Sequence, residues 1–292
     1  MRDFASRSRP LRMSSIPMLF RCSLRGVLLH GGVIFDESGP AAHTGSIFHA
    51  GMAAFHNRED TDAALNAALA TFRQGSIHEA RRMLHRYSSD PRNATAEVIA
   101  VERPVSLKLP PWPTDPTGQT IYLTGTLDQI RRAPDGTLAV WDAKTSRRDQ
   151  LTTLHNSLYQ LCGYAVAASK LLRREVDPGG IIYIRGYLAR NAASEAAPQG
   201  VFIPSGLTLA DAKTLMEHVR RLVAAIRRGE YAPSPGDHCG YCPAVSPAAC
   251  ISLTVINKNR KKKTHNGNEC TDEATRQAVA GLAGIRNPFA DA

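Results

Sequence analysis

Two aspartates and a lysine on either side of a short turn are the residues of this sequence best suited to chemistry. Asp142 and Lys144 are two apart in a strand-like run, so their side chains point to the same face. Asp128 lies in the preceding strand-like run, before the turn sequence at 133–136. A hairpin closed by that turn places Asp128 opposite Asp142, with Cβ atoms about 5 Å apart, and a β-bulge would shift this pairing by one residue. Two carboxylates at so short a distance repel each other unless a cation lies between them, and their oxygens suit Mg²⁺ or Mn²⁺.

These residues predict a metal site that cuts phosphodiester bonds. Asp142 interrupts an otherwise apolar strand, and a carboxylate there needs a partner. Lys144 beside a metal can hold the attacking water or stabilise charge that develops on the phosphate. The alternative is that Asp128 and Asp142 are ordinary surface residues near a turn and that Lys144 is an exposed lysine at a strand end.

Four short motifs follow one another along the chain: Gly45-x-x-x-His49, Gly125-x-x-Asp128, Asp142-x-Lys144 and Gln160-x-x-x-Tyr164. With these motifs in this order, the chain resembles the PD-(D/E)XK nucleases. It is most similar to their RecB-like branch, which includes the CRISPR-associated exonucleases and the nuclease domain of bacterial recombination helicase–nucleases. The resemblance spans most of residues 14–250.

The resemblance implies a role for each motif residue. The metal would be held by His49, Asp128, Asp142 and the backbone carbonyl of Ala143. Lys144 would hold or activate the water, while Gln160 and Tyr164 would position the nucleic-acid strand. The family's core has the element order αβββαβ. Glu102 matches no motif. It could be another acidic contributor to the site, but we interpret it as a solvated strand residue.

The cysteines form a second pattern. Cys239-x-x-Cys242 can chelate a metal from a tight turn, and Cys250 follows after seven residues. The resemblance implies that these three cysteines and Cys22 bind a [4Fe–4S] cluster that clips the N- and C-terminal parts together. Structural zinc on the same four thiolates is the alternative.

Periodicity and turn residues predict a mixed α/β fold, with a mixed sheet flanked by helices. The resemblance implies that this fold is of the restriction-endonuclease type. We expect a disordered extension at 1–13, one nuclease domain with its cysteine cluster at 14–256 and a basic, disordered tail at 257–292. The expected helices are 14–30, 45–57, 61–75, 77–87, 150–174 and 207–228, and the expected strands are 96–109, 120–132, 137–145 and 180–188.

The net charge of +10 favours an anionic partner, although five cations at 258–263 supply half of it. No apolar run approaches the roughly 18 residues that span a bilayer, so we expect a cytoplasmic protein without a membrane partner. We therefore predict a Mg²⁺- or Mn²⁺-dependent DNA exonuclease that serves recombination, repair, phage replication or CRISPR adaptation. Its protein partner would be a helicase, or a recombination or CRISPR-adaptation protein. The alternatives are a non-catalytic nucleic-acid-binding protein of the same fold and a zinc-stabilised interaction module.

Overall fold

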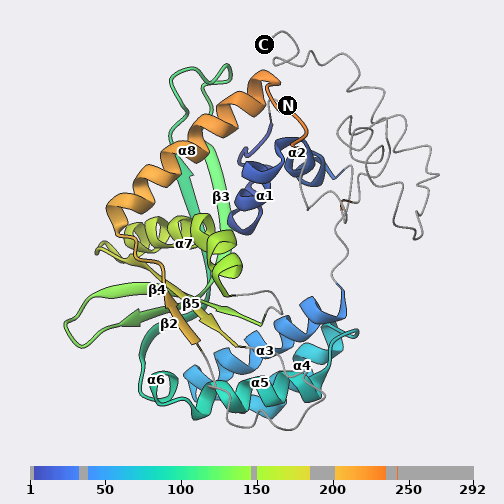
Figure 1. Cartoon of the computed structure of the whole chain (residues 1–292), viewed down its shortest axis with the longest axis vertical. Helices are drawn as coiled ribbons and strands as arrows, with labels where there is room; N and C mark the ends of the chain where they lie inside the picture. The colour runs from blue at the N-terminus through green and yellow to red at the C-terminus, as the bar shows by residue number, and fades with distance from the viewer. Residues whose placement is uncertain (1–2, 33–38, 146–149, 185–200, 235–241, 243–292) are drawn as a thin grey trace. The chain divides into compact units, whose positions relative to one another are not determined.

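A computed structural model of the chain describes residues 3–32, 39–145, 150–184, 201–234 and 242 (Figure 1). Its helices are the 3-10 helix η1 (Met13–Ser15) and the α-helices α1 (Ile16–Arg21), α2 (Ser23–Gly31), α3 (Pro40–Asn57), α4 (Thr61–Thr71), α5 (Ile77–Ser89), α6 (Pro91–Ala94), α7 (Gln150–Leu172) and α8 (Leu209–Arg228). Its strands are β1 (Leu11–Arg12), β2 (Glu97–Leu109), β3 (Ile121–Arg132), β4 (Leu138–Lys144), β5 (Asp177–Tyr183) and β6 (Val201–Pro204).

The chain folds into two compact units, each built from separate stretches of sequence. Among the described residues, the first comprises 3–32, 108–122, 218–234 and 242, and the second comprises 39–107, 123–145, 150–184 and 201–217. All the motif residues from Gly45 to Tyr164 belong to the second unit, whereas Cys22 and Cys242 belong to the first.

The strands form one mixed sheet, as we expected. The strand order is β1-β3-β4-β5-β6, and β2 also pairs with β3. The first two residues of β3 belong to the same unit as β1. β3 and β4 are antiparallel, β4 and β5 are parallel, and β5 and β6 are antiparallel. The mixed α/β class is therefore confirmed. Cys239 and Cys250, which belong to the expected cluster clip, lie outside the described residues.

The hairpin of β3 and β4 has the register that the sequence predicts. Gln129 pairs with Trp141, and the ladder continues to Arg132 and Leu138 next to the turn. The turn closes with a 2.9 Å hydrogen bond from Ala133 N to the carbonyl of Thr137. Asp128 and Asp142 are the next residues beyond the Gln129–Trp141 pair, so the ladder brings the two aspartates toward each other.

Helices α3, α4 and α5 cover one hydrophobic core of the second unit. Ser76 caps α5 by accepting a 3.2 Å hydrogen bond from Glu79 N. The apolar residues of α5 recur every three or four positions, so one face of the helix is buried. That face packs with residues of α3 and of the sheet, and this cluster includes Ile47, Phe48, Met52, Ala80, Met83, Leu84, Tyr87, Ala143 and Ile182.

Three details differ from the sequence-based expectation. The expected helix at 14–30 is divided at Cys22, whose extended backbone (φ −153°, ψ 98°) separates α1 from α2. Residues 3–13, expected within a disordered extension, bury Phe4, Leu11 and Met13. The four-residue strand β6 was not anticipated, because its apolar run is short. None of the helices in the described part of the chain has the length and hydropathy that a membrane span requires.

Candidate active site

An imidazole and two carboxylates converge in the second unit. Nδ1 of His49 lies 2.8 Å from Oε1 of Glu102 and 3.7 Å from Oδ1 of Asp128. One ligand atom from each residue lies within 4.8 Å of the others. A nitrogen and two carboxylate oxygens at these separations suit a divalent cation, because each prefers to face a positive charge.

Three different elements supply these groups. His49 comes from α3, Glu102 from β2 and Asp128 from β3. Glu102 has a backbone φ of +45°, a left-handed conformation that is unfavourable for a residue with a side chain. Its side chain is 29% exposed and bonded to His49, so it is not the fully solvated strand residue that we expected. Such local strain is typical of functional sites.

Asp142 and Lys144 form an ion pair beside this cluster. Nζ of Lys144 lies 2.6 Å from Oδ2 of Asp142, whose side chain is 1% exposed. Oδ2 of Asp128 accepts a 2.7 Å hydrogen bond from the backbone N–H of Ala143, which connects the two strands next to the aspartates. Asp142 is not a member of the three-residue cluster, and its carboxylate contacts Lys144 and Gln160. Its role as a metal ligand, and that of the Ala143 carbonyl, stay predictions.

The electrostatics of the site reflect burial and mutual attraction. Burial raises the pKa of Asp142 to about 6, against the opposing effect of Lys144. Burial alone would lower the pKa of His49, but Asp128 and Glu102 outweigh it and raise that pKa to about 9. Burial likewise raises the pKa of Asp128, opposed by His49 and Lys144. Groups with shifted pKa values in one place indicate a functional site.

The fourth motif lies next to the aspartates. Nε2 of Gln160 donates to Oδ1 of Asp142 at 3.2 Å and to the hydroxyl of Tyr164 at 3.1 Å. Gly125 lies against the Tyr164 ring, where an added Cβ would be 2.7 Å from Cε1. A glycine is therefore required at this position if the Tyr164 ring is to remain where it is. The motif residues of α7 and β3 thus fit one another.

The other motif glycine has a comparable position. A Cβ added at Gly45 would lie 3.1 Å from Oγ1 of Thr145, the residue that follows Lys144. The first turns of α3 consequently approach the end of β4 closely. The structure thus brings together all four sequence motifs within the second unit.

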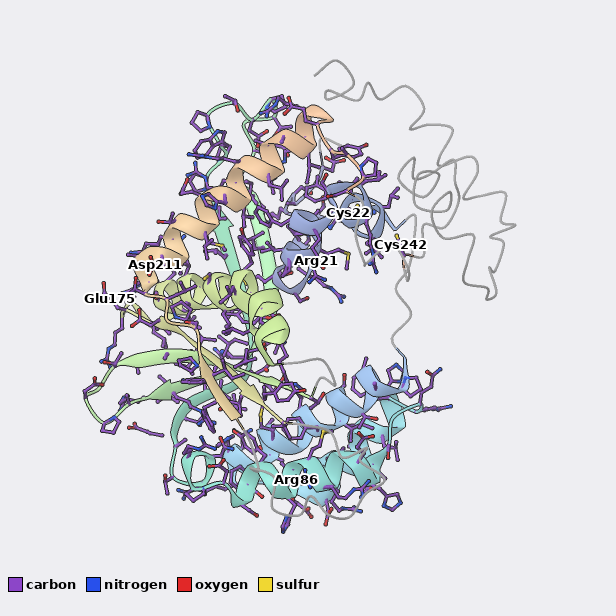
Figure 2. The ribbon with its side chains drawn as sticks, viewed as in Figure 1. Arg21, Cys22, Arg86, Glu175, Asp211 and Cys242 are labelled. Atoms are coloured by element: carbon purple, nitrogen blue, oxygen red, sulfur yellow. The ribbon has the colours of Figure 1, made fainter. Side chains whose placement is uncertain are left out.

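Two of the four proposed cluster cysteines fall within the described residues. Cys22, at the junction of α1 and α2, and Cys242 are both buried in the first unit (Figure 2). Cys242 packs against Leu28 of α2, six positions after Cys22. Cys239 and Cys250 lie outside the described residues, so the binding of a cluster stays a prediction.

Comparison with known proteins identifies the family. A family model described as the PD-(D/E)XK nuclease superfamily matches residues 13–246. No curated protein matches the chain. A solved structure titled "Crystal structure of SSO0001" is 18% identical, and the alignment covers 78% of this chain and 95% of that chain with a TM-score of 0.35. A superposition that weak supports no argument about fold or function.

Proposed function

The chain belongs to the PD-(D/E)XK nuclease superfamily, and from that premise we propose that it is a Mg²⁺- or Mn²⁺-dependent deoxyribonuclease acting as an exonuclease. Nucleases of this superfamily use divalent metals and act on nucleic acid. The observation that supports the proposal best is the proximity of a possible metal site, His49–Glu102–Asp128, to the ion pair of buried Asp142 with Lys144.

The donor set fits the metal that the superfamily uses. His49, Glu102 and Asp128 would hold it, and Asp142 lies beside them on the neighbouring strand. The bound metal would lower the pKa of its water and polarise the scissile phosphate. Without a metal, the carboxylates of Glu102 and Asp128 would repel each other, so a bound cation would stabilise their close approach.

The remaining side chains would act on water and on the strand. Lys144 is a point-charge donor and would orient the attacking water or stabilise charge on the phosphate. Asp142 fixes that ammonium by the 2.6 Å contact. Gln160 and Tyr164, joined by a hydrogen bond, would position the substrate strand next to Asp142.

We further infer that the chain belongs to the RecB-like branch and carries a cysteine-bound [4Fe–4S] cluster. The placement of Gln160 and Tyr164 beside Asp142 supports the branch, since this pair is part of its motif pattern. The burial of Cys22 and Cys242 in one unit supports the cluster. DNA processing in recombination, repair, phage replication or CRISPR adaptation, with a helicase or adaptation protein as partner, is the role that this branch implies.

The test is DNA degradation by the purified protein. We expect Mg²⁺ or Mn²⁺ to support degradation of linear DNA and EDTA to stop it, while closed circular DNA stays intact if the enzyme needs an end. Asp142→Asn should abolish degradation, whereas Asp62→Asn, an exposed aspartate on α4, should not. Degradation at the normal rate by Asp142→Asn would show that the site is wrong. Cleavage of circular DNA would contradict only the exonuclease assignment.

A further inference from the structure

Arginines of α8 fix the loop that joins β2 to β3 in the first unit. Arg220 donates hydrogen bonds to the carbonyl oxygens of Pro110 and Pro111, at 2.8 and 2.6 Å. Arg228 donates to the carbonyl oxygen of Thr114 at 2.9 Å. The loop therefore lies along the C-terminal half of α8, as Figure 1 shows. Because its prolines restrict the backbone as well, the loop is rigid before any partner binds.

This rigid loop presents an aromatic ring among cations. The ring of Trp112 is half-buried, and the guanidinium carbons of Arg220 and Arg221 lie 5.3 and 4.5 Å from its centroid. Arg221 is exposed, and no carboxylate in the described part of the chain forms an ion pair with it. An aromatic face flanked by arginines is the combination with which proteins bind single-stranded nucleic acid.

We propose that Trp112 is a stacking platform for an unpaired base and that Arg221 contacts the adjoining phosphate. A base would stack on the indole in the place of the Arg221 guanidinium. The long side chain of Arg221 would then turn toward a phosphate of the bound strand. Unpaired nucleotides are the expected partner, because bases within a duplex are already stacked on both faces. The inference rests on the proposed function for the choice of nucleic acid and adds the class of strand that the first unit recognises.

A purely structural role for the ring is the main alternative. The Arg220 hydrogen bonds and the proline-rich sequence already order the loop, so the second stacked arginine is not needed for that purpose. Arg221 also stays exposed despite the stacking, which leaves its charge available to a phosphate. These features favour binding over packing alone.

The experiment measures binding without cleavage. The sequence has two tryptophans, so Trp141→Phe leaves Trp112 as the fluorescent reporter in the full-length protein. In EDTA, this variant is titrated with oligothymidylate, with an abasic deoxyribose-phosphate strand of equal length and with a duplex. We expect quenching by oligothymidylate and little quenching by the other two. The Trp112 variants lack this reporter, so their binding is measured by the fluorescence anisotropy of a labelled strand. Trp112→Ala should weaken oligothymidylate binding about 5- to 100-fold and leave abasic binding unchanged.

Two further variants separate stacking from charge. Trp112→Phe keeps an aromatic face and should retain most of the affinity, so it decides the matter if Trp112→Ala does not fold. For both single strands, Arg221→Gln should reduce the slope of log affinity against log salt by the amount expected for about one phosphate contact. Unaltered oligothymidylate binding by Trp112→Ala, or equal quenching by the abasic strand or the duplex, would overturn the inference. If DNA is cut normally while Trp112 stays unquenched, this inference fails and the proposed function stands; absence of any binding or cleavage contradicts both.

Discussion

At the scale of single residues, three carboxylates dominate the site. Glu102, Asp128 and Asp142 face His49 and Lys144, which balance part of their charge in the structure. A divalent cation would take over that balance near His49, while Lys144 keeps its contact with Asp142. Of the two hairpin aspartates, Asp128 thus belongs to the three-residue cluster, whereas Asp142 pairs with Lys144.

Glu102 should be a genuine ligand and not an incidental neighbour. Glu102→Gln removes the charge at nearly constant volume and should weaken Mn²⁺ binding at least about tenfold, because a carboxylate ligand is lost. Isothermal titration with Mn²⁺ measures this directly. Glu97→Gln is the matched control, since Glu97 is an exposed residue of the same strand that pairs with Arg132. Equal Mn²⁺ affinity of the two variants would remove Glu102 from the site.

The sequence located most of these residues but not Glu102. Alternation on strands and a short turn brought Asp128, Asp142 and Lys144 together, whereas His49 was assigned from the family motif alone. The position of Glu102 depends on a left-handed φ within β2, which periodicity does not encode. A glutamate shortly before a proline in an otherwise apolar strand was the one available signal, and it is a weak one.

At the scale of elements, the first unit depends on a buried ion pair. Nη1 of Arg227 on α8 lies 2.6 Å from Oδ2 of Asp115 in the β2–β3 loop, and both side chains are fully buried. Arg227→Met leaves the aspartate without a counter-charge and should lower the free energy of unfolding by about 3–5 kcal/mol. Urea denaturation measures this loss. The double variant with Asp115→Asn should recover part of it, and a strictly additive double variant would contradict the coupling.

The packing of α3 against α5 should depend on pH through His56. Its Nε2 lies 2.6 Å from the Tyr87 hydroxyl, and burial, with a smaller effect of Arg131, lowers the pKa of His56 to about 4. A histidine in the unfolded chain has a pKa near 6.5. Below that pH, His56 is therefore protonated in the unfolded chain but stays neutral in the folded protein until the pH approaches 4. His56 therefore reduces stability progressively from about pH 6.5 down to about pH 4, and has no such effect above pH 6.5.

The measurement compares melting temperatures of the wild type and His56→Gln at pH 7 and pH 5. We expect the wild type to lose more stability than the variant over this interval, because glutamine does not titrate. The same pH-dependent loss in both proteins would show that other groups are responsible.

Elements with strong local signals were the ones that the sequence predicted well. The hairpin register followed from its turn, and α5 followed from its apolar spacing. The division of the first helix at Cys22 and the short strand β6 were missed, since both depend on tertiary packing. Local patterns rarely specify elements of so few residues.

At the scale of the whole molecule, a cluster would connect Cys22 with cysteines more than 200 residues later in the chain. Cys22→Ser and Cys242→Ser should lose iron and lower the melting temperature, because cluster binding contributes to folding. Cys162→Ser is the control, since burial raises the pKa of that thiol to about 12 and disfavours the thiolate form that binds metal. Metal analysis and visible absorption measure the outcome. Zinc in place of iron supports the alternative, and unchanged iron in both variants excludes the cluster.

The central claim is that the second unit hydrolyses phosphodiester bonds with Lys144 assisting at the phosphate. The most direct test is the single-turnover rate of DNA cleavage by Lys144→Gln at saturating Mn²⁺ and DNA. We expect a rate about 100- to 1,000-fold below the wild type, the size expected when one donor to developing charge is lost. Lys144→Gln should still bind Mn²⁺, but its melting temperature should fall because buried Asp142 loses its counter-charge, so the rate is measured well below that melting temperature. An unchanged cleavage rate in Lys144→Gln would show that this lysine does not take part in phosphodiester hydrolysis.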